Sequence, residues 1–351
     1  MTAVPTEGLV ARAGDPMLDT VEDTPGQWAR ALEIARAATL PTRRPRAIVV
    51  AGMGGSGVAG DVAALVAAEQ ARVPVVAVHG EDLPAFVGPE DLVVLVSHSG
   101  TTGETLACAR QARRRGARMV AVTSGGPLAE LVAEAGQPVV YVPDEAPPRA
   151  SMALLSVPVL AVLESVGVVE ATLEECGRVP GRLHGLLDRW AGPGADGPGR
   201  PEGEPRRLAR ALGARSPVFL GVGAVGAVVA TRGRNQVAEN AERPALAAEL
   251  PEADHNQLVG WAGSGTRGTC DLVVLRPWHE EPATQRRVTA TIDIAGPGFR
   301  EVHEHRLVAG GVVEQLAAGF LFVDLLSVHV ALLSGVDPTP IEAIEELKRR
   351  L

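Results

Sequence analysis

The chain has 351 residues and a mass of 36.4 kDa, which leaves room for two domains of ordinary size and excludes a small stapled scaffold. It is 46% hydrophobic and 21% charged, a composition typical of globular proteins. A net charge of −9 and an aromatic content of 3% argue against nucleic-acid and anionic-membrane partners, which require basic or aromatic-rich surfaces.

The cysteines and the N-terminus indicate a cytoplasmic protein. The three cysteines, Cys108, Cys176 and Cys270, are widely spaced and odd in number, as is common in a reducing compartment. They form no CxxC pair, so the sequence predicts no zinc site. The first residues lack the basic segment and apolar run of a secretory signal.

The first half of the chain alternates strand and helix patterns. A helix is expected over 21–40, and the apolar run 46–51 ends in glycines as a buried parallel strand does. Further strands are expected over 73–78, 92–97, 119–123 and 138–142. Helices are expected between them over 58–69, 104–115 and 128–134. This alternation predicts an α/β domain with a doubly wound, mostly parallel sheet flanked by helices.

The second half repeats the alternation after an apolar helix expected over 152–166. Strands are expected over 217–221 and 272–275, and helices over 224–239, 312–333 and 340–350. The stretch 316–333 is apolar but is interrupted by Asp324, Ser327 and His329, which indicates a buried helix and not a membrane span.

Both halves begin with a strand that runs into a GxGxxG turn, at 52–57 and at 221–226. We therefore expect an internal duplication. Gly, Pro and charged residues dominate 191–205, as in a linker. The predicted organisation is a leader and helix over 1–45, a first domain over 46–185, a linker over 186–210 and a second domain over 211–351.

A GxGxxG turn between a strand and a helix has three interpretations. It can bind the pyrophosphate of a dinucleotide, but a nicotinamide site would place an acidic residue at the end of the second strand, and Glu81 lies too late. It can be a structural turn alone. We favour a backbone cradle for a sugar phosphate, formed by Gly54, Gly55 and Ser56 of the glycine turn Gly52–Gly57.

A hydroxyl-rich segment follows the strand expected over 92–97. Five hydroxyl side chains occur within nine residues, namely Ser97, Ser99, Thr101, Thr102 and Thr105. The segment enters a helix near Glu104, where hydroxyls, free amide groups and the helix dipole together favour a dianionic phosphate. The alternative is that Thr101 or Thr102 only caps the helix. We call residues Ser97–Thr102 the hydroxyl loop.

The hydroxyl loop resembles the phosphate-binding loop of sugar isomerase (SIS) domains, and the chain from about residue 46 onward resembles the bifunctional phosphoglucose/phosphomannose isomerase family. Several motifs carry this resemblance in the family's order; they are Gly52 to Asp61, the hydroxyl loop, Pro147 to Ser151, Asn235 to Ala241, Pro251 to Asn256, Asp337 to Pro340 and Lys348. The resemblance implies two tandem SIS domains.

The resemblance also implies roles for single residues. Glu239 matches the base that moves a proton between C2 and C1, and Arg149 matches the positive charge beside the enediolate. His255 and Lys348 match the residues that open the sugar ring. Thr339 is a candidate for the hydroxyl near C2 that lets either epimer bind. The family's shared sites further imply a homodimer in which His255 reaches the neighbouring subunit's pocket.

The chain departs from the family pattern at four places. His98 stands where tyrosine is common, and Thr101 stands where asparagine is common. Glu242-Arg243 replaces a usual lysine, and Gln257 replaces a frequent glutamate. These changes leave the proposed acid and base in place and bear on substrate preference and catalytic strength.

The expected activity is interconversion of glucose 6-phosphate, and of mannose 6-phosphate, with fructose 6-phosphate through a cis-enediol, without a cofactor or a metal. The alternative is a phosphosugar-binding sensor, although the leader before Arg46 is too short and too weakly basic for a helix-turn-helix. A metal-dependent mannose phosphate isomerase would need a His-rich β-barrel, which eight scattered histidines and an α/β pattern do not supply. We expect the pocket to lie between the two domains.

Overall fold

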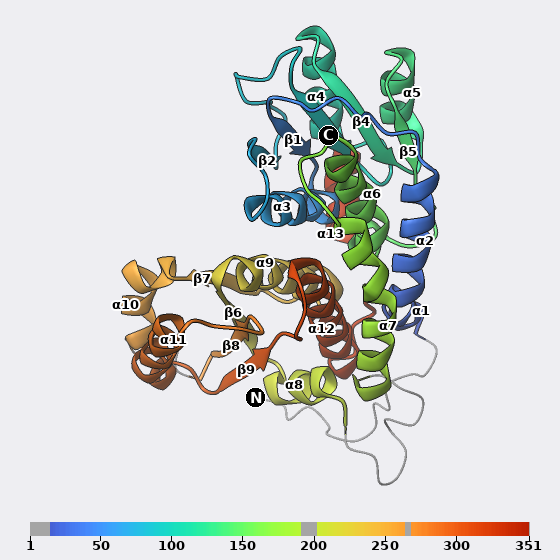
Figure 1. Ribbon diagram of the computed structural model, residues 1–351. Helices are drawn as coiled ribbons and strands as arrows, with labels where there is room; N and C mark the ends of the chain where they lie inside the picture. Colours follow the sequence, from blue (N-terminus) through green and yellow to red (C-terminus); the bar gives the residue numbers. More distant parts are fainter. Residues whose placement is uncertain (1–14, 191–201, 264–267, 351) are drawn as a thin grey trace. The chain divides into compact units, whose positions relative to one another are not determined.

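The computed structural model describes residues 15–190, 202–263 and 268–350, which fold into two compact units (Figure 1). The N-terminal unit comprises Asp23–Gly185 and Val308–Ala318. The C-terminal unit comprises helix α1 (Pro16–Glu22), the chain from Leu186 to Leu307 and the chain from Gly319 onward. Helices α7 (Thr172–Trp190) and α12 (Val312–Leu333) each contribute residues to both units.

The N-terminal unit contains a five-stranded parallel sheet of order β2-β1-β3-β4-β5. Its strands are β1 (Ile48–Ala51), β2 (Val75–Val78), β3 (Leu92–Val96), β4 (Arg118–Thr123) and β5 (Val139–Tyr141). Its helices include α2 (Thr24–Ala37), α3 (Gly54–Ala68), α4 (Gly103–Arg114), α5 (Gly126–Glu134) and α6 (Met152–Ser165), with a 3-10 turn η1 (Pro148–Ala150). The predicted alternation of strands and helices in this half is confirmed.

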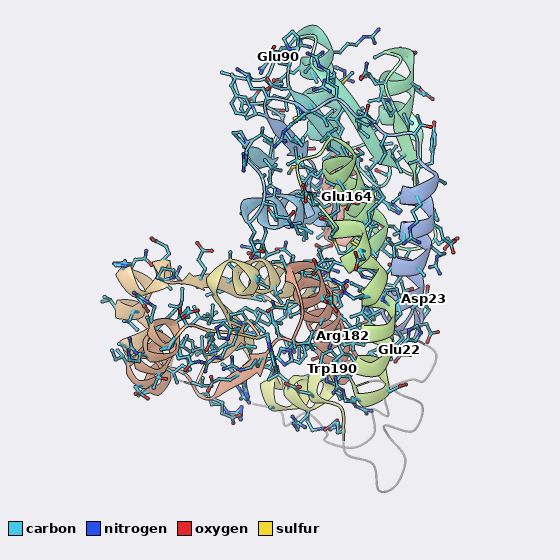
Figure 2. All side chains as sticks on the ribbon, in the orientation of Figure 1. Glu22, Asp23, Glu90, Glu164, Arg182 and Trp190 are labelled. Carbon is cyan, nitrogen blue, oxygen red and sulfur yellow. The ribbon has the colours of Figure 1, made fainter. Side chains whose placement is uncertain are left out.

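The strands of this sheet are buried because helices cover both faces. β1 and β3 are apolar and buried along their whole length, as expected for the centre of a parallel sheet. Alternate strand residues pack with α4 and α5 in one core cluster; these are Val49, Ala51, Val93, Leu95, Met119 and Ala121. Helices α2 and α3 each pack against α6. Glu90, labelled in Figure 2, precedes β3 at the amino-terminal edge of the sheet.

The C-terminal unit contains a four-stranded parallel sheet of order β7-β6-β8-β9. Its strands are β6 (Ser216–Val222), β7 (Leu246–Leu250), β8 (Cys270–Arg276) and β9 (Val302–Arg306). Its helices include α8 (Glu204–Leu212), α9 (Gly223–Asn240), α10 (Gln257–Ala262), α11 (Pro282–Ala295) and α13 (Glu342–Arg350), with 3-10 turns η2 (Glu252–His255) and η3 (Gly296–Gly298). In both sheets the first strand lies between the second and the third, as an internal duplication requires.

Several elements were not predicted. The strands β7 and β9 lie at the edges of their sheet, and their sequences LAAEL and VHEHR lack the apolar run of a central strand. Part of the predicted linker 186–210 is helical, since α7 continues to Trp190 and α8 begins at Glu204. Residues 191–201 of that linker lie outside the described residues.

The helix expected over 312–333 is α12, and 89% of its apolar window is buried within the protein. The prediction of a buried helix is therefore confirmed. Two of its polar residues have buried partners, because Asp324 binds Arg232 and Ser327 binds Asn240. His329 is 6% exposed, and burial lowers its pKa to about 4, so the ring is neutral at physiological pH.

Two arginine side chains of α7 bind Glu314, which lies in the segment Val308–Ala318 of the N-terminal unit. Arg182, labelled in Figure 2, donates to Glu314, with Nη2 3.2 Å from Oε1. Arg178 lies 3.8 Å from the same carboxylate. Glu314 is nearly buried, so these contacts supply the partners that its charge requires.

Candidate functional site

The hydroxyl loop connects β3 to α4 at the carboxyl edge of the first sheet. Thr102 occupies the N-cap position of α4, but its side chain makes no capping hydrogen bond. Its hydroxyl instead shares a 2.8 Å hydrogen bond with the Ser97 hydroxyl, which also accepts from the Gly100 amide. The capping interpretation is therefore wrong for Thr102, and the first amide groups of α4 receive no side-chain cap from it.

Two hydroxyls of the loop are turned to solvent. Ser99 and Thr101 are both exposed, and their hydroxyl oxygens lie 2.9 Å apart. Ser97 is fully buried, and its hydroxyl stabilises the loop through its hydrogen bonds with Thr102 and Gly100. Thr105 is only 1% exposed, and its hydroxyl has no hydrogen-bond partner among the described residues. The structure thus separates an exposed hydroxyl pair, suited to an anion, from hydroxyls that lie behind the surface.

The glycine of the hydroxyl loop is required by packing. Gly100 has φ +67°, and a Cβ built there would lie 1.9 Å from the Gly125 carbonyl oxygen. The Gly100 carbonyl accepts from the Leu128 amide, and the His98 carbonyl accepts from the Ser124 amide and hydroxyl. The close backbone approach expected at Gly100 is therefore an approach to the turn before α5, which holds the loop in place.

The glycine turn lies beside the hydroxyl loop and begins α3. The Ser56 hydroxyl accepts from the His98 amide at 3.3 Å, which joins the two segments directly. Gly54 has φ +52° and is exposed, with open space where a side chain would stand. A Cβ on Gly55 would lie 2.9 Å from the Pro148 carbonyl oxygen and 3.3 Å from the Arg149 Cα. The turn therefore packs directly against the segment that carries Arg149.

Arg149 is 4% exposed and lies in the 3-10 turn η1, which precedes α6. A guanidinium keeps its charge in such a setting because its pKa is far above neutrality. The N-terminal unit thus brings together Gly54, Gly55, Ser56, Arg149 and the hydroxyl loop. Backbone amides at two helix N-termini and exposed hydroxyls form a surface that suits a phosphorylated sugar, and the buried Arg149 lies beside the glycine turn.

The remaining predicted residues belong to the C-terminal unit. Glu239 is half-buried and is the penultimate residue of α9. His255 is exposed and ends η2, which follows β7. The neighbouring residues brace this turn, since Asn256 donates to Glu252 at 2.8 Å and Asp254 accepts from Arg287 at 2.8 Å.

Within this unit the structure places Glu239 and His255 at opposite edges of the sheet. Helix α9 starts directly after β6, at the carboxyl edge, and runs back before the parallel strand β7 begins. Its 18 residues cover roughly 27 Å at the usual rise of a helix. Glu239 therefore lies at the amino edge, whereas His255 lies after the carboxyl end of β7.

Thr339 and Lys348 lie near the C-terminal end of the chain. Thr339 is exposed in the turn before α13, where its amide donates to Asp337 Oδ1 at 2.9 Å. Lys348 is exposed on α13, a helix in which no residue is buried. Both side chains are accessible to a ligand.

The second glycine turn, at 221–226, has different surroundings from the first. A Cβ on Gly221 would lie 2.3 Å from the Gly226 carbonyl carbon, and one on Gly226 would lie 2.6 Å from the Leu275 carbonyl oxygen, so these two glycines are required by the packing of α9 on the sheet. The loop after β8 has no hydroxyl residue from Arg276 to Glu281, and its buried Glu280 is held by Arg276 and Arg306. A buried carboxylate beside this turn disfavours the binding of a phosphate there.

Two features were missed by sequence reasoning. His79 and Asp61 form a pair beside the glycine turn, and a buried polar network holds α9 against α12. The available signals were the acidic end of the Gly52 to Asp61 motif and the polar residues inside the apolar helix α12. Among the described residues, no group of three or more His, Cys, Asp or Glu side chains is placed to hold a metal ion.

Both halves of the chain match known families. Residues 43–156 match the SIS domain family, and residues 202–351 match the family described as the bacterial phospho-glucose isomerase C-terminal SIS domain. The fold is also that of the C-terminal domain of glucosamine-fructose-6-phosphate aminotransferase from Francisella tularensis, with a TM-score of 0.71, 16% identity and coverage of 95% of this chain and 100% of that one.

Curated relatives are similar along nearly the whole chain. The bifunctional phosphoglucose/phosphomannose isomerase of Caldicellulosiruptor bescii is 26% identical over 95% of this chain and 98% of its own length. The protein of the same name from Pyrobaculum aerophilum is 31% identical over 94% of this chain and 93% of its own length. The chain therefore belongs to the bifunctional phosphoglucose/phosphomannose isomerase family, with two SIS domains in tandem.

Proposed function

We propose that this protein interconverts glucose 6-phosphate and mannose 6-phosphate with fructose 6-phosphate through a cis-enediol. The observation that carries the proposal is the meeting of the hydroxyl loop, the glycine turn and Arg149 at the carboxyl edge of one sheet, in a chain of this family. Phosphate binding alone would suit a sensor equally well. The match of Glu239 to the proton-transfer base supports an enzyme.

The phosphate is held by the exposed hydroxyls of Ser99 and Thr101 and by amide groups at the start of α3 and α4. These groups are neutral, so the site supplies hydrogen bonds and helix dipoles in place of a lysine or arginine clamp. Ser97 and Thr102 keep the loop in shape by bonding each other.

The reaction moves protons and leaves the overall oxidation state of the sugar unchanged. His255 and Lys348 open the ring, and the Glu239 carboxylate then takes the proton from C2. The electrons of that C–H bond form the C1–C2 double bond of the enediolate, whose oxygens the Arg149 guanidinium stabilises. Return of the proton to C1 yields the ketose, so no redox cofactor is needed.

The separation of Glu239 and His255 within one C-terminal unit supports a site shared between two chains. The two residues lie at opposite edges of the same sheet, so one copy of this unit does not bring both to one sugar. A homodimer in which His255 serves the neighbouring chain's site fits this placement, and a separated monomer is expected to be inactive.

The decisive experiment is an assay of the wild-type protein with fructose 6-phosphate and EDTA, followed by separation of the aldose phosphates. We expect both glucose 6-phosphate and mannose 6-phosphate to form, and chelation to leave the rate unchanged. Binding of fructose 6-phosphate without turnover would favour the sensor. Turnover that chelation abolishes would contradict the enediol mechanism proposed for these residues.

The exposed hydroxyl pair gives a second prediction. The double substitution Ser99→Ala/Thr101→Val should raise KM for fructose 6-phosphate by about 100-fold or more, because it removes two hydrogen bonds to a charged group, each of which contributes about 1.5–3 kcal/mol. Initial rates over a range of substrate concentrations measure this effect. Thr289→Val, which removes an exposed hydroxyl from α11, is the matched control and should leave KM unchanged. An unchanged KM in the double variant would place the phosphate elsewhere.

A further inference from the structure

A histidine–aspartate pair lies directly against the glycine turn. His79 follows β2 at the carboxyl edge of the first sheet, next to β1, the strand that leads into the turn. Its Nε2 lies 2.9 Å from Oδ1 of Asp61, which is on α3. Asp61 ends the motif that begins at Gly52, and the proposed chemistry leaves it without a role.

The other side of the His79 ring faces the backbone of the turn. The Gly52 backbone contributes, as a hydrogen-bond acceptor, to the raised pKa of the ring. A Cβ built on Gly57 would lie 2.5 Å from His79 Nδ1 and 2.9 Å from the Gly52 carbonyl oxygen. The last glycine of the turn therefore leaves the space that the His79 ring fills beside the Gly52 carbonyl. The ring bridges the start of the turn, at Gly52, and the helix that leaves it, at Asp61.

Both partners of the ring are hydrogen-bond acceptors, namely a carboxylate and a backbone carbonyl. A neutral imidazole has a single N–H and can donate to one of them, whereas an imidazolium donates to both. The hydrogen bond with Asp61 is the main cause of a raised pKa for His79, which partial burial opposes. Asp61 is the charged residue of α3, and β1 has none. In the loop that follows His79, the side-chain amide of Gln111 donates to the Asp82 carboxylate and to the Glu81 backbone carbonyl.

We propose that His79 and Asp61 are positioning residues that hold the glycine turn in its phosphosugar-binding conformation, and that the protonated ring completes this clamp. The proposal rests on the assignment of Gly54, Gly55 and Ser56 to substrate binding. On one side the turn is tied to the hydroxyl loop through Ser56 and His98. The His79–Asp61 pair holds the other side of the glycine turn. Both sides of the turn are therefore fixed before the substrate binds.

The clamp has a defined pH dependence. A histidine whose pKa is raised in the folded protein contributes stability that is fully present below its ordinary pKa of 6.5 and is lost as pH rises through the raised value. Loss of the second N–H frees the Gly52 carbonyl. Substrate affinity should therefore fall on the alkaline side.

The test compares fructose 6-phosphate binding by calorimetry between pH 7 and pH 9.5, where the substrate phosphate is already a dianion. Wild-type Kd should rise by about three- to tenfold across this range, the effect of one lost hydrogen bond. His79→Gln should bind fructose 6-phosphate weakly and should not show this rise in Kd with pH, which we call the binding step. His279→Gln, which removes a 79% exposed side chain, is the matched control and should follow the wild type.

A second variant keeps the His79 ring and removes the negative charge of its partner, the Asp61 carboxylate. Asp61→Asn should lower the pKa of His79, measured by NMR titration of the imidazole, and should shift the step in Kd to lower pH by the same amount. The inference is overturned if His79→Gln retains the wild-type step, or if Asp61→Asn moves the NMR titration and leaves the binding step in place. A wild type that binds but does not turn over counts against the proposed reaction alone, because this readout is binding.

Discussion

Replacement of Glu239 by glutamine is expected to lower kcat by about 1,000-fold or more, with little change in KM. General acid–base catalysis by one positioned group contributes about 100- to 10,000-fold, and in this reaction the same carboxylate removes and returns the proton. Glutamine keeps the shape of the side chain and cannot accept that proton. The loss should therefore appear in the chemical step.

The measurement is a steady-state assay with fructose 6-phosphate that compares the wild type with Glu239→Gln and with a control variant. Glu249→Gln, which neutralises an exposed carboxylate on β7, is the matched control and should keep the wild-type rate. Solvent deuterium incorporation at C1 and C2 reports the proton transfer directly and should disappear with Glu239→Gln. A Glu239→Gln variant with wild-type kcat would show that another group is the base.

Asp324→Leu should destabilise the protein by about 3–5 kcal/mol, the usual effect of breaking a buried ion pair. The Arg232 guanidinium donates to both oxygens of Asp324, at 2.8 and 2.6 Å, and Gln236 donates to one of them at 2.9 Å. Arg232 and Asp324 are only 2% and 5% exposed. Without the carboxylate, a charge would remain buried in contact with the Phe320 ring, which cannot neutralise it.

The double variant Arg232→Met/Asp324→Leu is the control for this prediction. It removes both charges and should recover most of the lost stability, because a buried apolar pair of similar size avoids the desolvation cost. Urea unfolding measures the stability, and hydrogen exchange in α9 and α12 shows where it changes. Equal destabilisation in the single and double variants would show that the unpaired charge of Arg232 is not the main cause of the lost stability.

The same network bears on the proposed role of Glu239, which is close to it on α9. Arg232, Gln236 and Asn240 follow at four-residue spacing, so they share one face of the helix. The amide of Asn240 donates to the Ser327 hydroxyl at 2.9 Å, one residue beyond Glu239. A polar stripe of this kind allows one register between two helices, whereas apolar contacts alone would allow several.

Local sequence determined the central strands, the helices that follow them and the hydroxyl loop. Apolar runs such as 92–97 predict buried parallel strands because both faces of the sheet are covered, and β3 lies there. The hydroxyl loop was found because its residues are adjacent in the chain. The order of the motifs indicated the family, and the similarity of the whole chain to its relatives confirms it.

The tertiary structure decided what depends on contacts between distant residues. It revealed the edge strands β7 and β9, whose sequences carry no strong periodicity, and it divided the hydroxyls into the exposed pair Ser99 and Thr101 and those that brace the loop. It also showed that Gly57 makes room for His79. Periodicity and adjacent motifs are encoded over a few residues, whereas pairs such as His79 with Asp61 form only when separate elements pack together.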